Sequence, residues 1–480
     1  RQVYNEFSSG RQDVSALRDY ARYVYEIGGT LKYLLLFGDA SYDYKNRSEP
    51  YNNFVPVYES YETFHPIYSY SSDDYYGFFD ADEGEWEESV AGDHTMEIGV
   101  GRLPVKTLAE AKIVVDKIIR YASNPSTFGP WRNKVVYVAD DGDGNLHQEH
   151  AESLSDIVLN TTGQNVQKIY LDAFDQIVSP SSEKSPTLNR ELVKSIENGA
   201  LLFNYIGHGS EFQWMDEQVL TSSEIFGLRN YQKLSIFVTA TCQFGRYDNA
   251  GNSGAEDLIL GEQGAIALLT TTRLVFANTN FFLNQAFHLG WVNAAIDPSR
   301  RLGDILRDTK NNGLQGPVNR NFALLGDPML RPSFPEFDIT IDQLNTEEAV
   351  TWSALERITL TGKIRQEGEI VTNFSGKINA TLFDIPVKKI TKGQESSTMI
   401  FEEQDNVLYR GEATVTNGAF TLDFIVPKNI SYQNLEGRLS LYAWDNALKK
   451  DAGAMLDNLL LGGTDHTAPD DTTPPALKVY

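Results

Sequence analysis

The chain contains a single cysteine, Cys242, and a histidine between two glycines, His208 in the motif GHGS. A thiolate is a strong nucleophile, but a free thiol with a pKa of about 8.5 is mostly protonated at neutral pH. A neighbouring imidazole can take the thiol proton and later return it to a leaving amine. The residue types therefore predict a cysteine peptidase site, with Cys242 as nucleophile and His208 as its base.

Such a site also needs a carboxylate that orients the imidazole and stabilises its charged form. The segment VADDGD offers Asp140, Asp141 and Asp143. Asp141 is the preferred candidate. Asp140 or Asp143 could serve instead, and one of the three could cap the helix that follows.

Small and aromatic residues around the histidine have their own predicted roles. Gly207 and Gly209 flank His208, and glycines let the backbone approach a substrate closely. The N–H groups of Gly209 and Cys242 could receive a developing oxyanion. Trp214 could line a substrate pocket or pack on a strand edge.

Five nearly continuous apolar runs must position these residues, and they are typical of strands buried on both faces. They cover 31–41, 134–141, 200–208, 234–242 and 265–273. The first four end in Asp39, in Asp140 and Asp141, in His208, and in Cys242. Ligands of an open α/β sheet bind beyond the carboxyl ends of its strands. If the runs ending in His208 and Cys242 are neighbours, their ends lie about 5 Å apart.

Helical patterns separate these runs and complete the predicted fold. They cover 107–124, 146–160, 188–199 and 222–230. Alternating strands and helices predict right-handed βαβ units and a doubly wound, mostly parallel α/β sheet. The segment 222–230 is a suitable crossover between the runs that end in His208 and Cys242.

The domain organisation follows from a change of texture after RPSFPEFD at 331–338, which is typical of a linker. We expect a peptidase domain over 1–332, in two α/β subdomains of roughly 1–128 and 129–332. Short strands with period-two alternation then predict an immunoglobulin-like β-sandwich over 336–463, with a hairpin turn at TNGAF. The remaining 464–480 read as a linker and the start of a further domain.

Bulk properties exclude some classes of protein. The formal net charge is −25, so a nucleic-acid partner is not expected, because a polyanion needs a basic face. No run of about 18 apolar residues predicts a membrane-spanning helix. The chain begins at Arg1 without an apolar leader and holds one cysteine. We therefore expect a globular piece of a larger protein, without an internal disulfide.

Together these motifs resemble the gingipain family of caspase-like cysteine peptidases. The resemblance rests on NYIGHGSEFQW (204–214) and FVTATCQFG (237–245), and on a histidine-to-cysteine separation of 242 − 208 = 34. Further matching segments are DDYYGFF, MEIGVGRLPV, RNKVVYVADD, EQGAIALLTTT and LLGDPML. The resemblance implies Cys242 as nucleophile, His208 as base, Asp141 as the acidic third member and Gly209 in the oxyanion hole.

The same resemblance implies possible structural calcium, with no cofactor required for the chemistry. Candidate ligands are the loop carboxylates Asp73, Asp74, Asp82 and Asp143. The acidic clusters at 80–88 and 211–217 are otherwise expected to be solvated faces. Gingipains that cut after arginine have an acid at the start of the helix after VADD, where this chain has Asn145 or His147. Arginine specificity is therefore not expected, and a surface or capping role is expected for His147 and His150 rather than zinc binding.

The overall pattern is closest to the gingipain-like sortases of the type IX secretion system. That resemblance implies an enzyme secreted across the outer membrane and held at the bacterial cell surface. It would cleave C-terminal sorting domains from exported proteins and pass the acyl group to water or to an amine of an anionic lipopolysaccharide. An outer-membrane secretion complex would be its partner. A catalytically inactive secretion scaffold and a surface adhesin remain as alternative functions.

Overall fold

A computed structural model describes residues 1–480 except 63, 85–93, 181, 315, 343–349 and 468–480. The chain divides into two units. The first unit holds Arg1–Phe334 together with Lys388–Phe401, and the second holds Pro335–Val387 and Glu402–Tyr480. Most of the predicted final segment, 464–480, lies outside the described residues.

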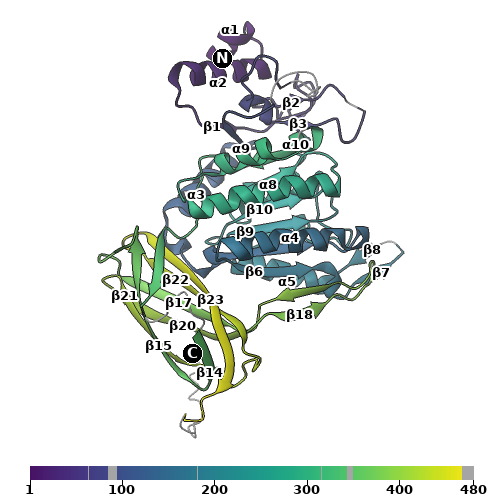
Figure 1. The fold of residues 1–480 in the computed structure, drawn as a ribbon. Coiled ribbons are helices and arrows are strands. Elements are labelled where there is room, and N and C mark those ends of the chain that lie inside the picture. Colours follow the sequence, from purple (N-terminus) through teal and green to yellow (C-terminus); the bar gives the residue numbers. More distant parts are fainter. Residues whose placement is uncertain (63, 85–93, 181, 315, 343–349, 468–480) are drawn as a thin grey trace. The chain divides into compact units, whose positions relative to one another are not determined.

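The first unit is built on one eight-stranded sheet (Figure 1). In spatial order its strands are β1 (Tyr33–Phe37), β4 (Gly99–Leu103), β12 (Phe322–Leu325), β11 (Ala265–Thr271), β10 (Ser235–Ala240), β9 (Leu202–Ile206), β5 (Lys134–Ala139) and β6 (Asn165–Tyr170). Every pairing is parallel except that of β11 with β12. The predicted mostly parallel sheet is confirmed, and all five apolar runs form strands of it.

Helices cover both faces of this sheet. They are α1 (Gln2–Ser8), α2 (Val14–Gly28), α3 (Leu108–Ser123), α4 (Leu146–Thr161), α5 (Pro186–Asn198), α6 (Ser222–Gly227), α7 (Gly254–Leu260), α8 (Ala277–Ile296), α9 (Leu302–Asn312) and α10 (Pro317–Asn321). Apolar side chains of α3, α5, α6 and α7 pack with Val136 and Val138 of β5, whereas those of α4, α8 and α9 pack with its Val135 and Tyr137. Successive strand residues face opposite layers, so the runs that form inner strands are apolar throughout. The prediction of burial on both faces is wrong for the edge strand β1, where Leu35 and Phe37 are exposed.

Short elements complete the first unit. The segment 42–95 contributes β2 (Tyr58–Glu59), β3 (Ser71–Ser72) and a 3-10 turn over Asp74–Gly77, and β7 (Ile177–Ser179) pairs with β8 (Ser182–Lys184). Across the described ranges, no helix combines the length and apolar character needed to cross a bilayer.

The second unit is a β-sandwich. Its strands are β13 (Phe337–Ile341), β14 (Val350–Ala354), β15 (Arg357–Gln366), β16 (Glu369–Ile370), β17 (Gly376–Phe383), β20 (Val407–Thr416), β21 (Ala419–Ile425), β22 (Leu435–Asp445) and β23 (Lys450–Thr464). Because β13 pairs with both β15 and β23, the hydrogen-bonded strands close into a ring. The predicted TNGAF hairpin joins β20 to β21, with Asn417 and Gly418 both at positive φ.

One hairpin leaves this pattern. Strands β18 (Val387–Ile390) and β19 (Ile400–Glu403) lie within the sequence range predicted for the sandwich, yet residues 388–401 belong to the first unit. We call residues 388–401 the arm. Its Phe401 packs against Tyr170 of β6, with the ring centroids 4.9 Å apart.

Candidate active site

The two predicted catalytic residues follow neighbouring strands. Strands β9 and β10 are adjacent and parallel, with Ile206 paired to Ala240 at their carboxyl ends. His208 and Cys242 each lie two residues beyond this pair. The sequence left open whether these two strands are neighbours; the structure pairs them, and α6 lies in the crossover between them. The two residues therefore leave the sheet at the same edge.

The Cys242 thiol is half-buried. Its Sγ lies 3.8 Å from the carbonyl oxygen of Val275, to which it donates a hydrogen bond. Burial raises the pKa of the Cys242 thiol above its ordinary value, and the contact with Val275 offsets part of that rise. Within the described chain the thiol has no hydrogen bond to His208, so the resting thiol is protonated at neutral pH.

The His208 ring points toward an acid and a second histidine. Its Nε2 lies 3.4 Å from Oδ2 of Asp143, and the same oxygen lies 3.3 Å from Nε2 of His147. The side chain of His208 is 46% exposed, whereas His147 is buried. Burial and the nearby His208 lower the pKa of His147 to about 4, so this imidazole is neutral at physiological pH.

The backbone of His208 is fixed from both sides. Its N–H donates to Oδ2 of buried Asp140 at 2.8 Å, and its carbonyl accepts from the Met215 N–H at 2.9 Å and from the Tyr205 hydroxyl. A Cβ on Gly207 would lie 2.4 Å from Cβ of Asp140, so only glycine fits. Sequence reasoning missed Tyr205, because a tyrosine inside an apolar strand is indistinguishable from an ordinary core residue.

The preference for Asp141 as the orienting acid has no contact to support it. Oδ2 of Asp141 accepts a hydrogen bond from the Gln176 amide, and its backbone N–H donates to Oδ1 of Asp140 at 3.0 Å. Burial raises the pKa of Asp141 to about 7. Of the three candidate acids, Asp143 therefore pairs with the His208 ring, Asp140 holds the His208 backbone, and Asp141 faces elsewhere.

The predicted oxyanion donors are available. In the described part of the chain, neither the N–H of Gly209 nor that of Cys242 donates a hydrogen bond. A Cβ on Gly209 would lie 2.6 Å from Oγ1 of Thr241, so a larger residue would disturb this turn. Both N–H groups are therefore free to donate to an oxyanion of the substrate.

The predicted substrate contact of Trp214 needs correction. Trp214 is fully buried and stacks on Tyr205, with ring centroids 4.3 Å apart. It therefore belongs to the core beneath the His208 loop, which is the packing role left open by the sequence. The indole lends rigidity to that loop and does not reach an open pocket.

The predicted calcium ligands are dispersed. Both carboxylate oxygens of Asp73 bind the buried Arg102 at 2.7 Å, and Asp74 binds the buried Lys310 at 2.7 Å. These two acids are already neutralised, which argues against calcium at either one. Asp82 is exposed, and Asp143 lies beside His208. The structure does not gather the four into one site.

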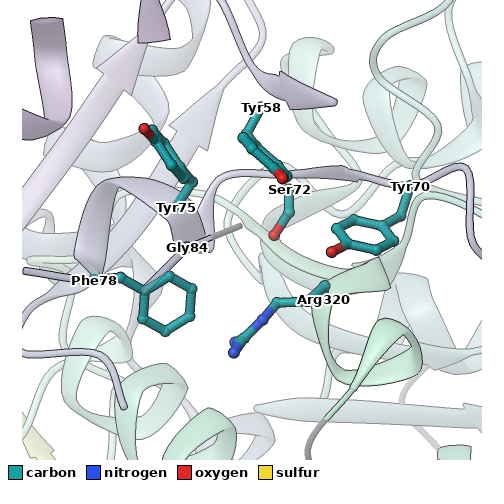
Figure 2. Close-up of a pocket in the computed structure, with 7 residues that line it drawn as sticks. All are labelled: Tyr58, Tyr70, Ser72, Tyr75, Phe78, Gly84 and Arg320. Atoms are coloured by element: carbon teal, nitrogen blue, oxygen red, sulfur yellow. The ribbon is translucent and has the colours of Figure 1, made fainter. Parts of the chain in front are cut away.

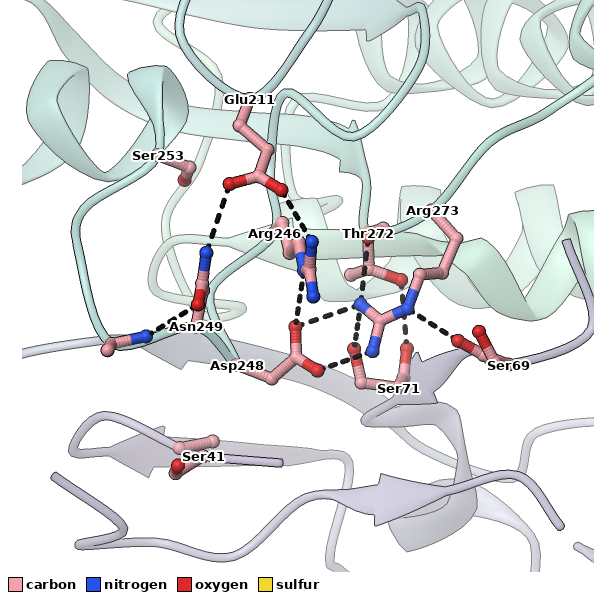
Figure 3. A network of polar contacts seen from close by, with 12 residues as sticks. Ser41, Ser69, Ser71, Glu211, Arg246, Asp248, Asn249, Ser253, Thr272 and Arg273 are labelled. Atoms are coloured by element: carbon pink, nitrogen blue, oxygen red, sulfur yellow. Dashed lines mark hydrogen bonds and ion pairs between the residues drawn. The ribbon is translucent and has the colours of Figure 1, made fainter. Parts of the chain in front are cut away.

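The acidic segment 211–217 was expected to be a solvated face, but its two glutamates have specific places. Glu217 is only 3% exposed. Glu211 accepts from Arg246 at 2.5 Å and from Asn249 at 3.0 Å (Figure 3). The segment 80–88, expected to be similar, falls largely outside the described residues.

Figure 3 shows that this network continues through Asp248 to Arg273. Asp248 is fully buried and accepts from the Arg273 guanidinium, with Nη1 to Oδ1 at 2.8 Å. Arg273 in turn donates to the Ser69 carbonyl and lies 3.4 Å from Oγ of Ser71. Paired charges therefore join the loops after β9, β10 and β11, and hydrogen bonds from Arg273 connect them to the β3 segment.

A separate small recess has aromatic walls (Figure 2). Its lining residues are Tyr58, Tyr70, Ser72, Tyr75, Phe78, Gly84 and Arg320. The Arg320 guanidinium lies 4.1 Å from the Phe78 ring centroid. None of the predicted catalytic residues lines this recess.

Two groups of side chains have the spacing of metal ligands among the described residues. One is Asp143, His147 and His208, and the other is Asp141, Glu217 and Glu395. The first has the nitrogen and oxygen donors that zinc accepts, but it includes the predicted catalytic base. The second offers oxygen donors alone.

Comparisons with known proteins identify the family of the chain. A model of peptidase family C25 matches residues 1–333. The chain belongs to peptidase family C25. It is 22% identical over 196 residues to gingipain R2 and to gingipain R1 of Porphyromonas gingivalis, across 38% of this chain. The matched regions make up 24% and 18% of those two relatives, so the chain matches only a minor part of their length.

The solved structure of gingipain R supports the fold of this family C25 chain. The crystal structure of the Arg-specific cysteine proteinase gingipain R superposes with a TM-score of 0.54 and 17% identity, covering 95% of this chain and 90% of that one. Dimeric latent PorU from Porphyromonas gingivalis matches with a TM-score of 0.40 and 24% identity, covering 99% of this chain and 41% of that one. The gingipain-type α/β fold followed by a β-sandwich is thus established for this family C25 member.

Proposed function

We propose that this family C25 chain is a cysteine endopeptidase in which Cys242 is the nucleophile and His208 the general base. The proposal rests on one observation: His208 and Cys242 each lie two residues beyond the paired residues Ile206 and Ala240 of adjacent parallel strands. Cα atoms of adjacent strands are about 5 Å apart, so short side-chain rotations can bring imidazole and thiol together.

The chemical steps follow from these groups. The Cys242 thiol passes its proton to the His208 imidazole as sulfur attacks the scissile carbonyl carbon. The carbonyl oxygen becomes an oxyanion and accepts hydrogen bonds from the N–H groups of Gly209 and Cys242. The tetrahedral adduct then collapses, the C–N bond breaks, and the imidazolium returns its proton to the leaving amine. A thioester on Cys242 remains.

Neighbouring groups assist the base. Asp143, 3.4 Å from the His208 ring, favours the imidazolium that forms during attack. His147 shares the same carboxylate but has a pKa lowered to about 4, so it stays neutral and does not compete as a cation. We assign the orienting role, predicted for Asp141, to Asp143, because Asp143 is the acid that pairs with the ring.

The finer proposal is that the thioester is resolved by an amine as well as by water, as in a sortase. It is supported by the sequence resemblance to gingipain-like sortases and by the absence of an acid at Asn145 and His147, where arginine-specific relatives have one. Under this proposal the substrates are exported proteins with C-terminal sorting domains, the acceptor is an anionic lipopolysaccharide amine, and the enzyme works at the outer cell surface beside a secretion-complex partner.

The nucleophile can be tested directly, because Cys242 is the only thiol in the chain. Iodoacetamide should alkylate the wild type at neutral pH about ten-fold faster than His208→Ala, since an imidazole that rotates to the thiol takes its proton and makes the reactive thiolate. His65→Ala, at an exposed histidine away from the predicted site, is the matched control and should react like the wild type. Equal rates in all three proteins would remove His208 from the mechanism.

The sortase step needs a cargo experiment. An exported protein with its sorting domain is incubated with the enzyme and a small amine, and the new carboxyl terminus is identified by mass spectrometry. Both the acid and the amide are expected with wild type, and neither with Cys242→Ala. Acid alone would reduce the function to a peptidase. Normal processing of cargo in cells that carry Cys242→Ala would support the inactive scaffold instead.

A further inference from the structure

Three carboxylates from three separate segments meet beside the loop that carries His208. Asp141 follows β5, Glu217 lies in the loop after β9, and Glu395 lies on the arm. One oxygen of each lies within 4.8 Å of an oxygen of the others. Through the described ranges, none of the three forms an ion pair with a lysine, arginine or histidine.

Two of these acids are removed from solvent. Asp141 is fully buried and Glu217 is 3% exposed, whereas Glu395 is exposed. Oδ1 of Asp141 is buried and has no hydrogen-bond partner in the described structure. Burial raises the pKa of Asp141 to about 7 and that of Glu217 to about 8. A buried carboxylate without a partner is costly, so this cluster lacks a positive charge.

The arm holds Glu395 in place. Both carboxylate oxygens of Asp172, a fully buried residue, accept from the arm, from the Gly393 N–H at 2.6 Å and the Gln394 N–H at 2.8 Å. On the other side of Glu395, the Ser396 hydroxyl donates to the Asp141 carbonyl at 2.7 Å. Glu395 thus sits between two anchored residues, and its approach to Asp141 follows from how the arm is bound.

The donor set selects the class of ligand. All three donors are carboxylates, which suit hard cations, whereas zinc sites usually recruit imidazole or thiolate. Calcium binds oxygens at about 2.3–2.6 Å, so two ligand oxygens can be no more than about 5 Å apart, and the spacing here meets that limit. Calcium also tolerates irregular ligand sets drawn from loops, while magnesium demands near-ideal octahedral geometry.

We propose that Asp141, Glu217 and Glu395 form a calcium site that fastens the arm to the loop carrying His208. These are not the residues from which the sequence predicts calcium binding. The bound ion replaces the missing positive charge and joins three segments that are far apart in the sequence. Because Asp140, next to Asp141, holds the His208 backbone at 2.8 Å, the site also stabilises the position of the proposed base. The inference does not depend on the chain being a peptidase.

The test is calcium titration of the full chain by calorimetry, after removal of metals with a chelator. The wild type should bind calcium with a dissociation constant of about 10⁻⁵–10⁻³ M. Glu217→Gln and Glu395→Gln should each weaken this event by about ten-fold or more. Glu183→Gln is the matched control, because Glu183 lies close enough to Glu395 to raise its pKa but is outside the cluster. It should bind within about two-fold of the wild type.

Thermal unfolding separates loss of the site from loss of the fold. In chelator, Glu217→Gln should be as stable as the wild type or more stable, because the amide cannot ionise and a buried carboxylate without a partner is costly. Calcium should raise the melting temperature of the wild type but not that of Glu217→Gln or Glu395→Gln. Glu395 is exposed, so its variant keeps its core even if Glu217→Gln does not fold. Unchanged affinity in Glu395→Gln, or no binding to the wild type at about 10 mM calcium, would overturn the proposal.

Discussion

Two polar clusters beside the catalytic loops differ in charge balance. In the cluster of Figure 3, Glu211 binds Arg246 and Asp248 binds Arg273, so each acid meets a guanidinium. In the other, Asp141, Glu217 and Glu395 have no cation within the described chain. The first cluster is complete with the protein's own atoms, whereas the second needs an ion from solution. A buried carboxylate is costly unless a cation pairs with it. The cluster of Figure 3 is therefore a structural network, and the cluster of Asp141, Glu217 and Glu395 is the proposed binding site.

A third cluster is intermediate. Asp39 and Glu256, both fully buried, share the single Lys106, which lies 3.6 Å from Asp39 and 3.0 Å from Glu256. Asp39 was grouped with the catalytic edge because it ends the first apolar run. Strand β1, however, is separated from β10 by three strands, or roughly 19 Å at about 4.8 Å per step. Asp39 therefore belongs to a structural group in which two carboxyl groups share one lysine.

The largest expected effect comes from breaking the balanced cluster. Asp248→Asn removes the carboxylate that pairs most closely with the buried Arg273 guanidinium and leaves it with Glu59, 3.6 Å away. This should lower the free energy of unfolding by about 3–5 kcal/mol. Urea unfolding measures it. Glu211→Gln is the comparison variant, because Arg246 is 28% exposed and can reach water, so its loss should be clearly smaller. A change below about 1 kcal/mol for Asp248→Asn would mean that the pairing contributes little.

The cluster of Asp39, Glu256 and Lys106 should make the free energy of unfolding depend on pH. Burial, followed by the charge of Glu256, raises the pKa of Asp39 to about 7, against about 3.9 when unfolded. The folded chain therefore holds a proton that the unfolded chain lacks between these values. The stability from this group is full below about pH 4 and is lost as the pH rises to about 7, on the order of 4 kcal/mol in total.

Asp39→Asn isolates that contribution. The variant cannot titrate at this position. Its free energy of unfolding should therefore fall less than that of the wild type between about pH 4.5 and about pH 7, the range set by the unfolded and folded pKa values of Asp39. Lys106 keeps Glu256 as its partner in the variant. Parallel pH curves for the two proteins would contradict the assignment.

A smaller effect is expected from loosening the arm. Asp172→Ala removes the carboxylate that accepts from Gly393 and Gln394, which should reduce stability by about 1–3 kcal/mol because the freed N–H groups lose a charged acceptor. Limited proteolysis should then cut within 388–401, and calcium affinity should fall although no proposed ligand has changed. If Asp172→Ala still bound calcium tightly after cleavage of the arm, the arm would not contribute to the calcium site.

The smallest effect is expected at an exposed pair. Arg357 and Asp423 lie on the sandwich and form an ion pair in which both side chains are well exposed. Asp423→Asn should leave the unfolding curve nearly unchanged, because solvent already screens the two charges. If Asp423→Asn lowered the free energy of unfolding as much as Asp248→Asn does, burial would not explain the difference between the two ion pairs.

Much of the first unit could be predicted because its signals are local. The five apolar runs became strands, and the four helical patterns became α3, α4, α5 and α6. The TNGAF turn also formed its hairpin. Periodicity and turn chemistry depend on residues close together in the chain, so these elements are recoverable from sequence.

Contacts between distant segments could not be predicted in this way. Trp214 and a pocket-lining tryptophan have the same sequence signature, and only its stacking on Tyr205 shows that it is core. Asp73 and Asp74 read as free loop acids until the fold brings Arg102 and Lys310 to them. No sequence pattern in residues 388–401 predicts that this segment, which lies between two strands of the sandwich, belongs to the first unit.

The amino-acid sequence by itself determined the sheet, its helices and the two residues, His208 and Cys242, that end neighbouring strands. Local patterns predict the strands and right-handed βαβ connections, whereas the order of the strands in the sheet is seen only in the structure. Only the tertiary structure decided which acid faces the His208 ring, and that Glu395 approaches Asp141 across 395 − 141 = 254 residues. Side-chain partners are fixed by packing between segments, and no local pattern encodes that choice.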